Sequence, residues 1–337
     1  MPAHFVKNFL NCALVGLTVA VANTTLAHHS LFAFYMDTFM DLEGVVMGLE
    51  LRNPHISVTM LVENESGEEE IWELAGDSAN AVERRGITHD TLRVGDRVRV
   101  AGYPSKLGYK SLLITNILMP DGKERLLTER PRPWRWSEPP AETRAIAAET
   151  SLGRSIFRVW SFGEFMQLRS PLMFTSAAQT AIAAWDPLTD MLALQCVPPG
   201  MPNAMYSPYP IEFIDEGDQI RLRIEEWEAV RIINMVASEI PDDAPETPHG
   251  YSIGHWEGDS LIVETGRIDF PYMDDAGTPM SEQVRMREHF SLSEDGNRLD
   301  YENVITDPQT LTEPAIWNAA WVWVPDKRIM SFECDPQ

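Results

Sequence analysis

The stretch His249–Thr265, HGYSIGHWEGDSLIVET, predicts a β-hairpin. Gly258-Asp259 separates two alternating runs, and Gly at the first position of a two-residue turn is typical of hairpins. This turn places Glu257 opposite Ser260, Trp256 opposite Leu261, His255 opposite Ile262, Gly254 opposite Val263 and Ile253 opposite Glu264. Side chains alternate along a strand, so Trp256, Leu261 and Val263 share one face and His255, Glu257 and Glu264 the other. The apolar Trp256 face is therefore expected to pack inward.

Further short strands surround this hairpin at regular spacing. They are predicted over 155–162, 210–214, 219–225, 229–235, 283–292, 298–306, 319–324 and 328–333, with one helix over 176–185. Many short strands joined by local turns indicate an antiparallel, lipocalin-like closed barrel or a sandwich. A barrel of this size can enclose one small ligand.

The segment 41–119 predicts a second, smaller barrel. Strands are expected over 41–50, 56–62, 69–75, 92–100 and 111–119, with Ile56, Val58, Met60 and Val62 on one face. Ser78 is expected to cap a helix that ends at Gly86. Three strands, a helix and two strands is the order of the five-stranded oligonucleotide/oligosaccharide-binding (OB) barrel. The fold class is thus all-β, although the fold name does not itself give a function.

The stretch 120–150 differs in composition from both sides. Pro131, Pro133, Pro139 and Pro140 flank Trp134 and Trp136, which is typical of an extended linker. The predicted organisation is a signal peptide over 1–27, an OB-like barrel over 28–119, a linker over 120–150 and a larger barrel over 151–337.

The chain is strongly acidic. Its 51 acidic and 27 basic residues give a formal charge of −24. This charge would repel nucleic acid and anionic membranes, so neither is an expected partner. Small molecules, cations and other proteins remain open as partners.

Residues 1–27 resemble an export signal that is cleaved after Ala27. Lys7 is the only charge, an apolar run follows it, and small residues precede the cleavage position. The alternative is an uncleaved anchor, but the apolar run is shorter than the roughly 20 residues a membrane span needs. We expect a periplasmic or secreted protein with no membrane span after signal removal.

Two cysteines remain after the signal, Cys196 and Cys334. An exported protein meets an oxidising environment, where the two are free to form a disulfide. The alternative is two buried free thiols.

Four motifs together resemble a known group of proteins. They are Ala27-His28-His29-Ser30, Asn53-Pro54-His55, Cys196-Val197-Pro198-Pro199-Gly200-Met201-Pro202 and the run from Gly250 to Thr265. The combination resembles a family of exported bacterial proteins whose N-terminal part is a domain of unknown function. The resemblance implies a periplasmic two-domain β protein and brings no settled activity. Tyr251 and His289 stand where these proteins usually carry His and Arg.

The histidines at the expected mature N-terminus are candidate copper ligands. A free α-amine and the His28 imidazole can chelate copper, with His29 or His55 adding a nitrogen, since imidazole suits this metal. The alternative is an unstructured polar start to the domain. His249, His255 and His289 lack zinc-site spacing, and no motif for a nucleotide or a covalent haem is present.

Acid/base chemistry without a required cofactor is the catalytic alternative. The candidate catalytic residues are Tyr251, Glu257, Glu288 and Asp307, and the candidate substrate-binding residues are Arg231, Ser252, Trp256, Trp321 and Trp323. Charged residues on outer strand faces and tryptophans in a core are the ordinary alternatives for both sets.

Three functions are therefore carried forward. The leading one is binding, or conversion of the lyase, isomerase or hydratase type, of a hydrophobic small molecule such as a terpenoid or steroid-like compound. The second is a copper-binding periplasmic protein, and the third is a non-catalytic module that docks a protein partner.

Overall fold

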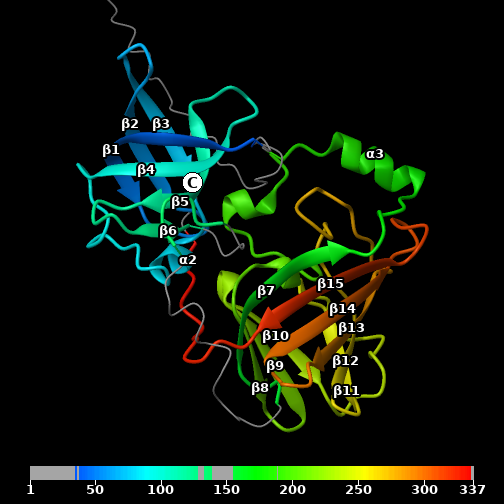
Figure 1. The fold of residues 1–337 in the computed structure, drawn as a ribbon. Coiled ribbons are helices and arrows are strands. Elements are labelled where there is room, and N and C mark those ends of the chain that lie inside the picture. The colour runs from blue at the N-terminus through cyan, green and yellow to red at the C-terminus, as the bar shows by residue number, and fades with distance from the viewer. Residues whose placement is uncertain (1–34, 36–37, 128–132, 139–154, 188, 335–337) are drawn as a thin grey trace, which may run out of the picture.

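Two β-barrels make up the described part of the chain (Figure 1). The computed structural model describes residues 35, 38–127, 133–138, 155–187 and 189–334. A five-stranded barrel precedes a nine-stranded one and the helices are few and short, which confirms the all-β fold class. Within these residues, no helix is long and apolar enough to cross a membrane.

The first barrel follows the predicted order of three strands, a helix and two strands. Its elements are β1 (Met40–Glu50), β2 (Ser57–Glu63), β3 (Glu69–Ala75), α2 (Ala79–Glu83), β4 (Arg97–Pro104) and β5 (Ser111–Leu118). The strand order is β3-β2-β1-β4-β5, and a parallel pairing of β3 with β5 closes the sheet. Val58, Met60 and Val62 are buried on one face, as their alternation predicts. Ser78 caps α2, its hydroxyl accepting a hydrogen bond from the amide of Ala81.

The stretch predicted as a linker begins inside the first barrel. A short strand, β6 (Glu124–Leu126), pairs with β5. Backbone amides of Arg135, Trp136 and Ser137 donate to the Glu124 carboxylate at 2.8 to 3.1 Å. Burial acts to raise the pKa of Glu124, but these bonds and one from Asn116 lower it below its usual value. Residues 139–150 of the stretch lie outside the described residues.

The second barrel closes around nine strands. They are β7 (Val159–Leu168), β8 (Ile211–Asp215), β9 (Gln219–Ile224), β10 (Ala229–Asn234), β11 (Tyr251–Glu257), β12 (Ser260–Gly266), β13 (Arg285–Leu292), β14 (Arg298–Thr306) and β15 (Ala315–Val322). The helix α3 (Ser176–Ala184) and the 3-10 turns η2 (Leu192–Gln195) and η3 (Asn203–Tyr206) lie between β7 and β8, and η4 (Glu226–Glu228) precedes β10.

One seam of this barrel differs from the antiparallel expectation. β10 and β11 are parallel, and only Ile233 with Ser252 and Asn234 with Ile253 are paired between them. The connection over 235–250 returns the chain to the end where β10 began, so β11 runs in the same direction. The antiparallel pairing expected for the second barrel therefore does not hold at this seam.

The hairpin of β11 and β12 has the register predicted from its turn. Gly258 adopts a φ of 62°, the left-handed conformation that favours glycine at this position. The side chains of His255 and Glu257 are 54% and 57% exposed, so this polar face looks to solvent. Trp256 lies on the opposite face at the barrel rim, where its ring meets Phe157 edge to face at 6.1 Å between centroids.

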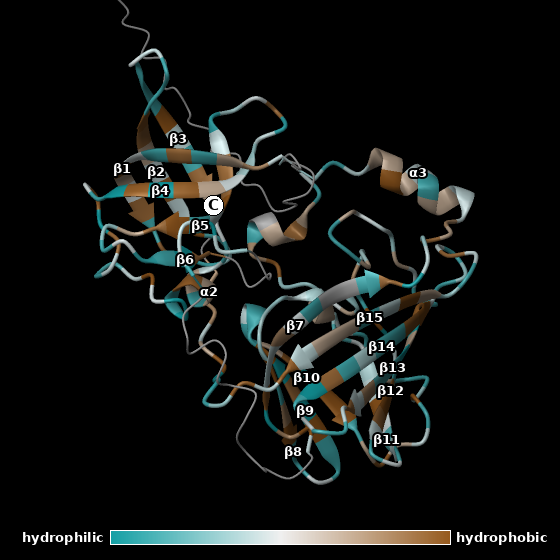
Figure 2. Cartoon of the chain, in the orientation of Figure 1, coloured by the Kyte–Doolittle hydropathy of each residue, from teal (hydrophilic) through white to brown (hydrophobic). Residues whose placement is uncertain are grey.

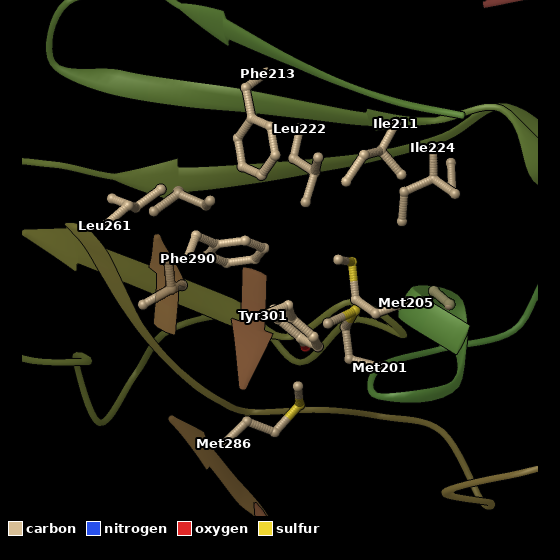
Figure 3. Close-up of a cluster of buried hydrophobic side chains, with 14 of the residues drawn as sticks. Met201, Met205, Ile211, Phe213, Leu222, Ile224, Leu261, Met286, Phe290 and Tyr301 are labelled. Atoms are coloured by element: carbon tan, nitrogen blue, oxygen red, sulfur yellow. The ribbon is translucent and has the colours of Figure 1, made fainter. Parts of the chain in front are cut away.

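Apolar and aromatic side chains line the interior of the second barrel. Figure 2 shows hydrophobic residues alternating with hydrophilic ones along its strands. The Phe290 ring lies 5.2 Å from the Phe213 ring and 4.8 Å from the Tyr301 ring, measured between centroids. Met201 and Met205 approach Tyr301 from the loop that holds η3 (Figure 3). The thioethers give this part of the core a polarizable, adaptable lining.

The chain after β15 leaves the second barrel and runs along the first (Figure 1). The strand predicted over 328–333 is wrong: this segment forms no strand, and its backbone bonds side chains of both barrels. The Asn80 amide donates to the Ser331 carbonyl at 2.9 Å, and Cys334 forms an isolated bridge with Asn53. Cys334 is disulfide-bonded to Cys196, the first of the two alternatives expected from the sequence.

Glu225 is the central acceptor between the barrels. Its carboxylate is fully buried and pairs with the Arg84 guanidinium from the end of α2. It also accepts from the Asn80 amide at 3.2 Å and from the Met330 backbone amide at 2.9 Å. A single carboxylate thus holds the first barrel and the C-terminal segment against the second barrel.

Replacing Cys334 with serine is expected to lower the free energy of unfolding by about 4 kcal/mol, because the disulfide closes a long loop and restricts the unfolded chain. Urea unfolding followed by tryptophan fluorescence measures this difference. Reductant should destabilise the wild-type protein by a similar amount and leave the C334S variant unchanged. Equal stability of variant and wild type would contradict the expectation.

Candidate functional site

A buried ion pair lies inside the second barrel. The Arg231 guanidinium from β10 pairs with the Glu288 carboxylate from β13, and the two side chains are 2% and 0% exposed. Arg231 Nη1 donates to Glu288 Oε1 at 2.9 Å. Nε donates to the Ser252 hydroxyl at 2.9 Å, and Nη2 donates to the Thr265 hydroxyl at 2.5 Å. The sequence-predicted residues Arg231, Ser252 and Glu288 are therefore brought together.

Tyr301 completes the network on the far side of the pair. Its hydroxyl donates to Glu288 Oε1 at 2.8 Å. Burial, together with the Glu288 charge, raises the pKa of Tyr301 well above its usual value, so the hydroxyl keeps its proton. Burial alone would lower the pKa of Arg231, but Glu288 outweighs it and raises that pKa. Glu288 thus accepts three charge-assisted or phenolic bonds and is poorly placed to take a proton from a substrate.

Buried polar atoms without partners lie next to this network. Asn303 on β14 is 0% exposed, and neither its amide oxygen nor its amide nitrogen has a hydrogen-bond partner among the described residues. The strand ladder places Asn303 between Glu288 on β13 and Trp317 on β15. The indole nitrogen of Trp321 on β15 is likewise buried without a partner. An unsatisfied buried polar group costs about 1–3 kcal/mol, so these atoms need a partner such as an ordered water or a bound molecule.

Tyr206 on η3 covers the same region from the loop side. Its ring packs on Trp317 with centroids 4.8 Å apart and planes 31° from parallel. Its hydroxyl is buried and has no hydrogen-bond partner within the part of the chain that the structure describes. Burial, with Asp274 and Glu288 nearby, raises the pKa of Tyr206 well above its usual value. The phenol is therefore a neutral donor next to Trp317, the ladder partner of Asn303.

Sequence reasoning missed Asn303 and Tyr206. The alternation of β14 contains a signal for Asn303, since Leu299, Tyr301 and Ile305 on the same face are buried. No comparable signal marks Tyr206, which lies in a 3-10 turn outside the sheet and reaches the barrel only through tertiary packing.

The other predicted site residues lie apart from this network. Glu257 is on the outer face, where its Oε1 atom lies 3.1 Å from His255 Nε2 and 3.5 Å from Arg287 Nη2. The hydroxyl of Tyr251 is 3.5 Å from the Asn234 amide. Asp307 is buried in the turn after β14, where its carboxylate accepts from Ser281 and the Gln309 amide. The four catalytic candidates therefore do not meet in one site.

The predicted tryptophans are divided between the core and the rim. Trp321 is buried in the core and Trp323 packs against it. The Arg158 guanidinium lies 5.2 Å from the Trp323 ring centroid, within the range of a cation–π contact. Trp256 is at the rim, 43% exposed. Only Trp321 contacts the barrel interior next to the polar network, through Tyr301 at 5.4 Å between centroids.

The predicted copper ligands are only partly described. His28 and His29 lie outside the described residues. The Nδ1 atom of His55 is 3.0 Å from the Gly76 carbonyl, and burial lowers the pKa of this imidazole against the opposing effect of Asp77. Among the residues that the structure describes, no three His, Cys, Asp or Glu side chains are grouped to hold a metal ion. Copper binding stays a prediction.

Glu226 lies beside Glu225 near the junction of the barrels. Burial raises its pKa to about 7, reinforced by the nearby carboxylates of Asp275, Asp77 and Glu225. The folded protein therefore keeps this proton at pH values where the unfolded chain has released it.

Glu288→Gln is expected to lower the free energy of unfolding by about 3–5 kcal/mol, because it leaves the Arg231 guanidinium buried without its counter-charge. The double variant Arg231→Met/Glu288→Met, which removes both charges, should lose less. Urea unfolding measures both. A shift below about 1 kcal/mol for Glu288→Gln would show that the pair does not hold the barrel.

Glu226→Gln is expected to change how stability depends on pH. The pKa of Glu226 is raised in the folded state, so its contribution is complete at acidic pH and is lost as pH rises to about 7. The variant should therefore gain stability relative to wild type between about pH 5 and about pH 8. Exposed Glu239 gives the matched control, since Glu239→Gln should leave the pH profile parallel to wild type. Parallel profiles for Glu226→Gln as well would refute the assignment.

The comparison with known families reaches the first barrel only. Residues 16–113 match DUF6152, a family of unknown function. This match supports, for the N-terminal region, the resemblance seen in the sequence motifs. No curated protein matches the chain.

Proposed function

We propose that the second barrel binds a hydrophobic small molecule whose polar end meets Asn303 and Tyr206. The single observation that carries this proposal is the fully buried Asn303 amide, with both its oxygen and its nitrogen unpaired. A ligand that presents one hydrogen-bond donor and one acceptor would satisfy this amide. The Tyr206 hydroxyl would supply a further donor.

The surroundings of Asn303 favour an apolar body for the ligand. Aromatic and thioether side chains from β13, β15 and the η3 loop lie around the polar atoms. Ligand sites of small molecules are mostly apolar with few polar groups that fix orientation. A terpenoid-like or steroid-like compound with one polar end fits this description.

Binding is favoured over catalysis by the state of the two buried catalytic candidates, Glu288 and Asp307. Glu288 is held by Arg231 and Tyr301, and Asp307 is held by Ser281 and the Gln309 amide. A general acid or base needs a free position within reach of the substrate. We therefore propose a carrier or sensor of the molecule, with conversion as the weaker alternative.

Export of the protein belongs to the same proposal. The sequence of residues 1–27 and the Cys196–Cys334 disulfide support a periplasmic or secreted location.

Asn303→Leu, which keeps the side-chain size and removes the amide, is expected to abolish ligand retention while keeping or raising stability. Protein purified from its native host is extracted with organic solvent, and the extract is analysed by mass spectrometry. Displacement of Nile red gives a second measure of occupancy. Asn318→Leu, on the outer face of β15, is the matched control and should bind as wild type does. Absence of both an extracted compound and Nile red binding in the wild-type protein would indicate an internal water only and refute the proposal.

A further inference from the structure

An aliphatic row crosses the outer face of the first barrel. Val45 on β1 pairs with Leu61 on β2, and Leu61 pairs with Ile71 on β3. Val46 and Met60, the next residues along these strands, are 0% exposed and face the core. The aliphatic row therefore points away from the core. Ile71 remains 50% exposed, and Met47 beside the row is 49% exposed.

Carboxylates border this row on both sides. Glu63 and Glu69 face each other across β2 and β3 on one side of the row. Glu73, paired with Thr59 in the ladder, lies on the other side and accepts hydrogen bonds from the Thr59 hydroxyl. Within the described part of the chain, none of these three glutamates forms an ion pair with a basic side chain.

The opposed pair Glu63 and Glu69 is unfavourable by itself. Like charges directly opposite on a sheet destabilise it by a few tenths of a kcal/mol to about 1 kcal/mol. A cation placed over this pair would remove the repulsion. The exposed aliphatic row would at the same time gain from burial.

The spacing of the aliphatic row matches the spacing of side chains along one face of an α-helix. Neighbouring strands lie about 4.8 Å apart, so Val45 and Ile71 are about 10 Å apart across the sheet. Residues i and i+7 of an α-helix are separated by about 10.5 Å along its axis. A helix lying along the row would set its aliphatic stripe on Val45, Leu61 and Ile71 and its flanking Lys or Arg residues over the carboxylates.

We infer that this face docks a basic amphipathic helix of a partner protein. A second copy of this chain does not fit, because each copy carries a formal charge of −24. Nucleic acid is repelled for the same reason. The inferred surface is on the first barrel and does not depend on the ligand proposed for the second.

A synthetic fourteen-residue Leu/Lys peptide with leucines at helical i, i+3, i+4 and i+7 spacing is the probe. The peptide is fluorescently labelled, and its fluorescence anisotropy is measured as the protein is added. A peptide of the same composition with scrambled leucine spacing is the comparison. The helical peptide should bind about tenfold more tightly than the scrambled one, and its affinity should fall as salt rises. Equal affinity for the two peptides would refute the inference.

Variants of the chain distinguish peptide binding at this surface from attraction to the overall negative charge of the protein. Ile71→Ser should weaken peptide binding about tenfold, whereas Leu107→Ser, at another exposed aliphatic residue of the same barrel, should not. The double variant Glu63→Gln/Glu69→Gln should weaken peptide binding and reduce its salt dependence. The control Glu239→Gln/Glu294→Gln removes the same number of charges from the second barrel and should have smaller effects. Circular dichroism and melting curves confirm that each variant is folded. Equal effects of Ile71→Ser and Leu107→Ser would overturn the inference.

Discussion

Closure of the second barrel depends on the Arg231 side chain. Its strand, β10, shares only two residue pairs with β11, so the backbone ladder at this seam is short. Arg231 bonds Ser252 on β11, Thr265 on β12 and Glu288 on β13 from inside the barrel. Because each of these acceptors lies on a different strand, one guanidinium fork spans the seam that the backbone leaves weak. The same bonds fix Glu288 and Tyr301, and thereby shape the polar region around Asn303.

Local rules predicted much of the fold, because they depend on neighbouring residues. The Gly258 turn gave the complete register of β11 and β12, and Ser78 gave the start of α2. The parallel seam escaped prediction, since it is set by the path of 235–250 and not by any turn signal. The segment 328–333 has the alternation of a strand, but its backbone bonds Asn80 on the first barrel and Glu225 on the second, distant partners that no local pattern contains.

The candidate site was predicted in part. Arg231, Ser252 and Glu288 were named from residue type and strand position, and they meet in one network. Asn303 could not be predicted, because the sequence does not show that this inward-facing polar side chain lacks a partner. Tyr206 could not be predicted, because its place depends on the packing of a turn onto β15. His255 and Glu257, the most conspicuous titratable pair in the sequence, bond each other on the solvent face. Titratable residues that stand out in a sequence are therefore a different criterion from buried polar atoms that lack a hydrogen-bond partner in the structure. The second criterion is the better guide to a candidate site.

The position of the C-terminal segment also constrains the order of folding. Asn53 and Asn80 of the first barrel contact residues 331–334, which are made only after the entire second barrel. Each barrel can form its own core from its own strands, but the junction between them has to wait for the last part of the chain. Contacts of such long sequence separation form late and slowly. During synthesis, the first barrel therefore stands without its neighbour, and the mutual orientation of the two barrels is the final feature to be established.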